Sequence, residues 1–278
     1  MTCVCYISQT VFLTAVMKGN MLILAPLCLL LLWMLPVDSM GVSGHIKQVI
    51  PLNMAEDSVD DMYFGCSEEM MKKVEQLNSV QNKYDKEFAG VWKRAEQCAS
   101  EKRIKDEALT KEQLEAICAF TSNDIYGKFN DAVRNDGKNY PFFFHFPAFH
   151  FLLTSAIQSL NDNKTCLTAY RRTNDIFTGS KKQMIRFGSF ASSSLNTTLT
   201  DFGNETCFQI KTCSGAYLKH YSVYPSEDEV LIPPYEVFKI TKKIMGKNKI
   251  KGLHDCKRVY ILESAGGKST LNCKAACK

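Results

Sequence analysis

The chain has 278 residues, of which 45% are hydrophobic and 23% are charged, an ordinary composition for a folded protein. A chain of this length can bury a large core and form one or two domains. The formal net charge of +5 is mild and spread along the chain, which argues against nucleic acid as a partner. Twelve cysteines are many for a cytosolic protein and indicate an oxidising compartment.

The N-terminus carries an apolar run of the length found in secretory signal peptides. This run, Met21–Leu35, is short for a membrane span, and Pro36 with small and polar residues follows it. We predict a signal peptide over residues 1–38 that is removed on export, so that the mature chain covers residues 39–278. Met17 is an alternative start, because it opens a short basic segment before the run. An uncleaved membrane anchor is the alternative to cleavage.

Two further features agree with export. Three Asn-x-Thr triplets, the acceptor pattern for N-glycosylation, lie in polar stretches where surface loops are expected. The last six residues are polar and basic, without the hydrophobic tail of a lipid-anchor signal. We therefore expect a soluble, secreted protein that passes through the endoplasmic reticulum and has no membrane anchor in its mature form. The candidate acceptors are Asn163, Asn196 and Asn204.

The first half of the mature chain has the periodicity of amphipathic helices. Apolar side chains recur at helical spacing through residues 55–160. We place the first helix start at Asp57–Asp61, because these polar and acidic residues suit an N-cap and a first turn. Thr110 and Gln113 form a plausible capping box for a later helix.

A dense aromatic cluster surrounds two histidines, His145 and His150. Aromatic residues at this density favour a core-packing helix over residues 148–160, which begins after a proline turn. A metal site at the two histidines is the alternative. No third ligand stands at the spacing that zinc sites use, so we expect no metal.

From Thr165 onward the pattern changes to short β-prone runs separated by turns. Because helices precede strands without βαβ alternation, we predict an α+β fold with a helical part packed on a mixed or largely antiparallel sheet. The helical part covers about residues 55–160 and the strand-rich part about residues 165–273, within a single domain. The predicted strands are Cys166–Arg171, Ile185–Phe190, Cys207–Ile210, Gly215–Val223, Val230–Ile240 and Val259–Ser264.

The acidic stretch Glu227-Asp228-Glu229 precedes an apolar run and is a candidate site. In an extended strand, Glu227 and Glu229 point to the same face with Cα atoms about 6–7 Å apart, and Asp228 points away. Two carboxylates that face one space repel each other unless a cationic group lies between them. Such a pair would stabilise a substrate that becomes positive in its transition state. The alternative is an acidic turn that caps a strand.

Three segments of the strand-rich half carry polar groups at predicted strand ends. They are Tyr170-Arg171-Arg172, the serine-containing segment Phe187–Leu195, and the acidic stretch. In this order they resemble the Arg–Ser–Glu signature of the vertebrate arginine-specific ecto-mono(ADP-ribosyl)transferases. The resemblance extends over roughly Ile46–Cys273 and is closest in the segment Cys213–Phe238.

The resemblance implies an enzyme that moves ADP-ribose from NAD⁺ to the guanidinium of a protein arginine and releases nicotinamide. Glu229 would be the catalytic carboxylate that stabilises an oxocarbenium-like sugar. Glu227 would orient the incoming arginine, whose planar fork matches a carboxylate. Ser192 would donate a hydrogen bond to Glu229, and Arg171 would contact the NAD⁺ diphosphate. The candidates for NAD⁺ contact are Arg171, Ser192, Ser189 and Ser222.

NAD⁺, with NADP⁺ as an alternative donor, is a consumed substrate of such an enzyme, so we expect no permanently bound cofactor. The expected partners are arginine-bearing proteins, and the expected state is a monomer. Two alternatives are an NAD⁺ glycohydrolase, in which water replaces arginine, and a catalytically silent binding protein. The chain departs from the family pattern at Arg172, where glycine is common, and at Ser193, where threonine is common.

The resemblance also implies two disulfides, each worth about 2–4 kcal/mol. Nine of the twelve cysteines follow residue 38, so at least one of them is free or intermolecular. A third pair between two helical positions is a further candidate, and three cysteines are left without an assigned partner. The implied pairs are Cys66–Cys273 and Cys166–Cys213, the candidate pair is Cys98–Cys118, and the unassigned cysteines are Cys207, Cys256 and Cys277.

Overall fold

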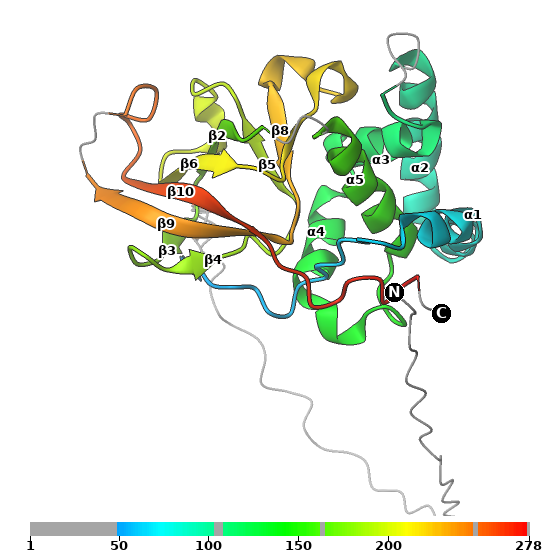
Figure 1. Cartoon of the computed structure of the whole chain (residues 1–278). Helices are drawn as coiled ribbons and strands as arrows, with labels where there is room; N and C mark the ends of the chain where they lie inside the picture. The colour runs from blue at the N-terminus through cyan, green and yellow to red at the C-terminus, as the bar shows by residue number, and fades with distance from the viewer. Residues whose placement is uncertain (1–48, 103–107, 162–164, 247–249, 277–278) are drawn as a thin grey trace, which may run out of the picture. The chain divides into compact units, whose positions relative to one another are not determined.

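After the short strand β1 (Val49–Pro51), the helices come first along the chain and the other strands follow, as Figure 1 shows. The computed structural model describes residues 49–102, 108–161, 165–246 and 250–276, which belong to one unit, Lys47–Lys278. The predicted signal peptide with Met17, the acceptor Asn163 and Cys277 lie outside the described residues.

Five α-helices form the first half of the described chain, and two of them begin where local sequence signals predict. The Thr110 side chain accepts a hydrogen bond from the Gln113 N–H, and the Gln113 side chain accepts one from the Thr110 N–H, which confirms the capping box. Pro147 opens the last helix, a position that suits proline because the first turn needs no N–H donor. The helices are α1 (Ser67–Tyr84), α2 (Lys86–Lys102), α3 (Lys111–Thr121), α4 (Tyr126–Asn135) and α5 (Pro147–Leu160).

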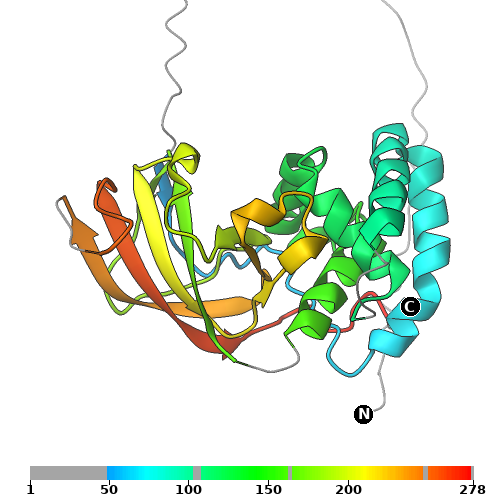
Figure 2. The same ribbon diagram turned by 90° about the horizontal axis from the view of Figure 1, so that it is seen from above.

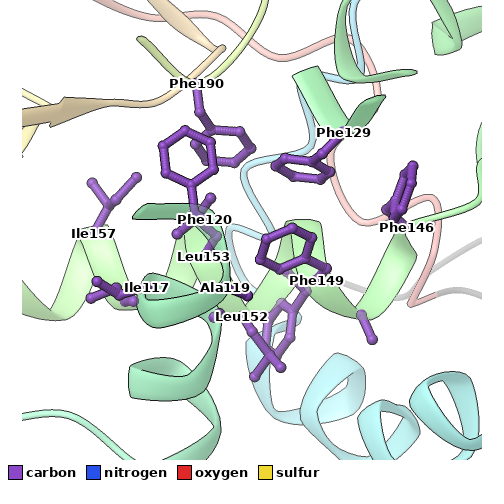
Figure 3. Packing of buried hydrophobic residues seen from close by; sticks show 14 of the residues in the cluster. Ile117, Ala119, Phe120, Phe129, Phe146, Phe149, Leu152, Leu153, Ile157 and Phe190 are labelled. Atoms are coloured by element: carbon purple, nitrogen blue, oxygen red, sulfur yellow. The ribbon is translucent and has the colours of Figure 1, made fainter. Parts of the chain in front are cut away.

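Aromatic side chains from these helices form the larger hydrophobic core (Figure 3). The rings of Phe129 and Phe149 lie 4.3 Å apart between centroids, and Phe190 from the strand-rich half stacks on Phe129 at 5.5 Å. All three side chains are completely buried. The packing of Phe190 against the helices therefore fixes the position of the segment just before Ser192.

The predicted first helix start at Asp57–Asp61 was wrong, because α1 begins at Ser67. Asp60 and Asp61 are instead buried acids with distant partners. Asp60 forms an ion pair with Arg186 at 2.6 Å, and Asp61 accepts a 2.5 Å hydrogen bond from the Tyr140 hydroxyl. Acidic residues that suit a helix start by local rules are here held by tertiary contacts.

Eight strands form a mixed sheet in the order β4-β9-β10-β6-β2-β5-β8-β7, with β10 and β6 parallel and the other neighbours antiparallel. Figure 2 shows the helices gathered at the side of the sheet away from β9 and β10. The α+β prediction is confirmed. The bounds are β2 (Leu167–Thr173), β4 (Met184–Ile185), β5 (Ala191–Ser194), β6 (Thr206–Thr212), β7 (Ala216–Tyr217), β8 (Glu229–Ile232), β9 (Glu236–Met245) and β10 (Arg258–Gly267), with β1 (Val49–Pro51) and β3 (Ile176–Thr178) as a separate parallel pair.

Three strand predictions were wrong in extent. The run Ile185–Phe190 is mostly irregular, because the chain turns at Gly188 with a φ of +72° and β5 starts only at Ala191. The run Gly215–Val223 contains the two-residue β7 and a 3₁₀ turn. The run Val230–Ile240 is divided into β8 and β9 at its proline pair, where proline has no N–H for the strand ladder.

Four disulfides link distant parts of the described chain. Both pairs implied by the resemblance are present, and so is the candidate pair between α2 and α3. The fourth joins two cysteines that had no assigned partner and ties β6 to the loop before β10. The pairs are Cys66–Cys273, Cys98–Cys118, Cys166–Cys213 and Cys207–Cys256.

The two histidines of the aromatic cluster have different environments. His150 is completely buried, with Nδ1 bonded to the Tyr63 hydroxyl at 2.8 Å and Nε2 bonded to the Val59 carbonyl oxygen at 3.0 Å. Burial lowers the pKa of His150 to about 4, so this histidine is neutral, while His145 is exposed. Among the described residues, no group of three or more His, Cys, Asp and Glu side chains is arranged to hold a metal. In the same part of the chain, no helix has the length and apolar character to cross a bilayer.

Candidate active site

A cavity of about 310 Å³ opens beside β2 and β5, which pair with each other at one position, Tyr170 with Ser194. Its wall includes Arg171 from β2, Ser192 from β5, Glu229 from β8 and Glu227 from the turn before β8. The sheet therefore brings together the four residues that the resemblance singled out, although they are far apart in the sequence.

Glu229, the first residue of β8, is the more buried of the two acids and is only 6% exposed. The Ser222 hydroxyl donates a hydrogen bond to its Oε2 at 3.0 Å, and the nearby Ser192 hydroxyl also favours the ionised carboxylate. Burial raises the pKa of Glu229 above its ordinary 4.5, although the hydroxyls of Ser192 and Ser222 lower it. The nearby Glu227 charge raises this pKa further, and the Arg171 charge lowers it.

Glu227 reaches the same cavity through a turn rather than along a strand. Residues Pro225–Glu227 form a 3₁₀ turn and Asp228 is left-handed with a φ of +47°, so the predicted extended geometry of the acidic stretch was wrong. The Asp228 carboxylate accepts a 2.8 Å hydrogen bond from the Tyr217 hydroxyl, which turns it away from the two glutamates. Burial also raises the pKa of the Glu227 carboxyl above its ordinary value.

Arg171 joins β2 to β5 near their one paired position. Its Nη1 donates a 2.5 Å hydrogen bond to the Ser192 carbonyl oxygen. Its positive charge also favours the ionised form of Glu229. No ion pair joins Arg171 directly to Glu229 in the described residues, so the two charges stand apart in one cavity.

Ser189 and Ser222, both candidates for NAD⁺ contact, lie outside the described wall of this cavity. Ser222 is completely buried and donates its hydrogen bond to Glu229 from the protein interior, not from the cavity wall. Ser189 lines a second cavity, where its hydroxyl accepts a 2.7 Å hydrogen bond from Arg134. Arg171 lines both cavities.

Arg172, the departure from the family pattern, binds the loops that flank the cavity. Its guanidinium donates to both carboxylate oxygens of Asp255, at 2.9 and 3.1 Å. These bonds lower the pKa of Asp255. It also donates to the carbonyl oxygens of Thr197, Gly203 and Gly252. The strand continues without interruption, because Arg172 pairs with Cys207 in the ladder between β2 and β6.

The helices also contribute to the cavity wall, which the sequence analysis missed. Phe120 and Thr121 at the end of α3, and Tyr126 at the start of α4, line the cavity. The Thr121 hydroxyl accepts a 3.0 Å hydrogen bond from the Val223 N–H and so holds the segment that carries Ser222. Helical periodicity identifies the buried face of a helix, but it does not show which helix end borders a cavity.

Known proteins share this architecture and this sequence pattern. A family model described as NAD:arginine ADP-ribosyltransferase matches residues 52–258. The chain is 36% identical over 245 residues to NAD(P)(+)--arginine ADP-ribosyltransferase 2 of Gallus gallus, with 84% of this chain and 75% of the relative covered. It is 43% identical over 197 residues to T-cell ecto-ADP-ribosyltransferase 1 of Mus musculus, with 67% of each chain covered.

The fold is similar to that of a crystal structure of the eukaryotic mono-ADP-ribosyltransferase ART2.2, a mutant in complex with NADH. The match has a TM-score of 0.68 at 31% sequence identity and covers 81% of this chain and 98% of that chain. Sequence, fold and the grouping of Arg171, Ser192 and Glu229 around one cavity thus agree. The protein belongs to the NAD:arginine ADP-ribosyltransferase family.

Proposed function

We propose that this protein transfers ADP-ribose from NAD⁺ to the guanidinium of arginine residues in target proteins and releases nicotinamide. The observation that supports this most strongly is the meeting of Arg171, Ser192, Glu227 and Glu229 at one cavity. The cavity wall combines a buried and a half-buried carboxylate with two arginines, of which Arg172 forms an ion pair with Asp255. NADP⁺ is a second candidate donor, because the name of the Gallus gallus relative covers both NAD⁺ and NADP⁺.

Glu229 stabilises the positive charge that develops on the ribose as the bond to nicotinamide breaks. The electron pair of this carbon–nitrogen bond leaves with nicotinamide, and the sugar becomes oxocarbenium-like. The hydrogen bond from Ser222 fixes the orientation of the carboxylate before the reaction, and the nearby Ser192 hydroxyl favours its ionised form. Because Glu229 is almost completely buried, its attraction for a cation is stronger than in water.

Glu227 orients the incoming arginine and accepts its proton as the new bond to the ribose carbon forms. Arginine is protonated at neutral pH, so its nitrogen must lose a proton to become a nucleophile. Burial raises the pKa of Glu227, which makes this carboxylate a better base than a solvated glutamate. Arg171 lines the cavity and binds the NAD⁺ diphosphate, since its donors fit phosphate oxygens.

We further propose that the enzyme is secreted through the endoplasmic reticulum as a monomer, with one catalytic domain over residues 39–278. The four disulfides support an oxidising compartment. The name of the Mus musculus relative describes that protein as an ecto-enzyme. N-glycosylation at Asn163, Asn196 and Asn204 belongs to the same proposal.

Incubation of the purified protein with labelled NAD⁺ and agmatine, an arginine mimic, tests the reaction. We expect labelled agmatine and free nicotinamide. The variant Glu229→Gln should lose transfer by about 10³-fold, the scale of removing one electrostatic group from an active site. Glu263→Gln, a change at an exposed residue of β10, is the matched control. No labelled product from the wild type at any pH would favour a silent binding protein.

The variant Glu227→Ala separates arginine transfer from NAD⁺ hydrolysis. If Glu227 only orients and deprotonates the acceptor, transfer to agmatine disappears in this variant and hydrolysis of NAD⁺ persists. Equal losses of both reactions would contradict its acceptor role. A wild-type protein that releases nicotinamide but leaves agmatine unmodified would instead be an NAD⁺ glycohydrolase.

A further inference from the structure

The glycosylation acceptor Asn196 lies in the wall of the catalytic cavity. It is half-buried and borders the same space as Glu227 and Glu229. The acceptor Asn204 differs, because it is exposed and lines neither of the two cavities described above. A modification of Asn196 would therefore change the surroundings of the reacting groups, and a modification of Asn204 would not.

Hydrogen bonds place Asn196 directly beside Glu227. The Ser194 hydroxyl donates to the Glu227 carbonyl oxygen at 2.5 Å and accepts from the Asn196 N–H at 2.8 Å. The Leu195 N–H donates to the Asp228 carbonyl oxygen at 3.0 Å, which continues the ladder of β5 and β8 by one step. The backbones of Asn196 and Glu227 thus lie opposite each other at the end of this ladder, and both residues line the cavity.

The side chain of Asn196 is oriented by its own acceptor triplet. Its Oδ1 accepts hydrogen bonds from the N–H of Thr198 at 2.8 Å and from the Thr198 hydroxyl at 2.7 Å. These bonds turn Oδ1 towards residue 198 and leave Nδ2 on the other side of the amide. Nδ2 makes no hydrogen bond within the described parts of the chain, and it is the atom to which an N-linked glycan is joined.

We propose that Asn196 is N-glycosylated during export and that its glycan restricts which arginines can reach Glu227. In this modification Nδ2 loses a proton and bonds to the anomeric carbon of an oligosaccharide, whose lipid diphosphate carrier leaves. The inference rests on the acceptor role proposed above for Glu227. An N-linked glycan is bulky and polar, so water and small guanidines pass it, whereas the surface of a folded protein collides with it. The glycosylated enzyme therefore selects small or extended acceptors.

The test compares two acceptors, agmatine and folded lysozyme, with protein secreted from a glycosylating cell line. Mass spectrometry of glycopeptides first measures occupancy at Asn196. Thr198→Ala removes the acceptor triplet and keeps Asn196, Thr198→Ser keeps both the triplet and the hydroxyl, and Asn204→Gln is the matched control. We expect the lysozyme-to-agmatine ratio of kcat/KM to rise about tenfold in Thr198→Ala alone. Agmatine transfer should stay within about twofold of the wild type in all three variants.

A second measurement removes the glycan without a mutation, because Thr198→Ala also deletes a hydrogen bond to Asn196. An endoglycosidase that leaves one sugar on each asparagine should raise the same ratio in the native wild-type protein. An unoccupied Asn196, or an unchanged ratio after trimming, would overturn this inference alone. An equal gain for both acceptors would also overturn it, since the glycan would then limit NAD⁺. Loss of agmatine transfer in every form would overturn the proposed function as well.

Discussion

Two acidic residues of this protein, Asp60 and Glu229, are almost completely buried, and they differ in how their charges are compensated. Asp60 and Asp61 lie in the segment before α1, and Glu227 and Glu229 border the cavity beside β2 and β5. Burial raises the pKa of Asp61 as it raises those of the two glutamates. A raised pKa alone therefore does not distinguish an acid that stabilises the fold from an acid that interacts with a substrate.

Asp60 is surrounded by permanent partners. Its carboxylate, completely buried, bonds to the Arg186 guanidinium at 2.6 Å and accepts the N–H groups of Thr270 at 2.9 Å and Leu271 at 3.0 Å. Arg186 also donates to the carbonyl oxygen of Lys268. The charge is fully compensated, and the pair connects the N-terminal and C-terminal segments of the described chain.

Glu229 has neutral partners instead. The hydroxyls of Ser222 and Ser192 favour its ionised form, while the guanidinium of Arg171 donates to the Ser192 carbonyl oxygen. Its negative charge thus remains available to a cation that enters the cavity. Asp60 and Glu229 are therefore distinguished by their partners and hardly by the extent of their burial.

Removal of Arg186, the permanent cationic partner of Asp60, should cause the largest loss in the free energy of unfolding. Arg186→Met leaves Asp60 buried without a cation, and we expect a loss of about 3–5 kcal/mol in the free energy of unfolding, measured by urea denaturation. Arg94→Met is the matched control, because it removes an exposed ion pair with Asp124 and should cost at most about 1 kcal/mol. Equal losses of unfolding free energy in the two variants would show that the buried Asp60–Arg186 pair matters no more than an exposed ion pair.

Neutralising Glu229 in the cavity, by contrast, should not destabilise the fold. At pH 7 the ionised Glu229 carboxylate costs free energy in the folded state, since its folded pKa lies above the ordinary 4.5. This cost grows as the pH rises from 4.5, the ordinary pKa of the unfolded state, to the raised pKa of Glu229 in the folded state. It is absent below pH 4.5. Glu229→Gln should therefore unfold at the same or a higher urea concentration than wild type at pH 7. A clear loss of stability would show that the carboxylate is structural.

A smaller effect should appear in the pH dependence of transfer. The Ser222 hydroxyl favours the ionised Glu229, so Ser222→Ala should raise the pKa of this carboxyl and move the acidic limb of kcat to higher pH. The expected shift is up to about 1 pH unit, because a hydrogen bond to a charged group contributes roughly 1.5 kcal/mol. Ser226→Ala, at an exposed position, should leave the limb in place. A limb unaffected by Ser222→Ala would mean that another group controls it.

Local patterns in the sequence determined the class of the fold and the start of two helices. Helical periodicity, the capping box at Thr110 and the proline at the start of α5 act between residues close in the chain. The order of Arg171, Ser192 and Glu229 was also sufficient to indicate the family. These features were predictable because each depends on neighbouring residues or on a recognisable order of motifs.

Only the tertiary structure decided how the polar residues are used. Asp60 and Arg186 are 126 residues apart, so no local rule could separate their buried pair from a helix cap. The turn at Pro225–Glu227 and the bond that turns Asp228 away are what bring Glu227 to the cavity. The position of Asn196 beside Glu227 likewise depends on the ladder between β5 and β8. The partner of a buried charge is set by packing between distant segments, which sequence spacing does not encode.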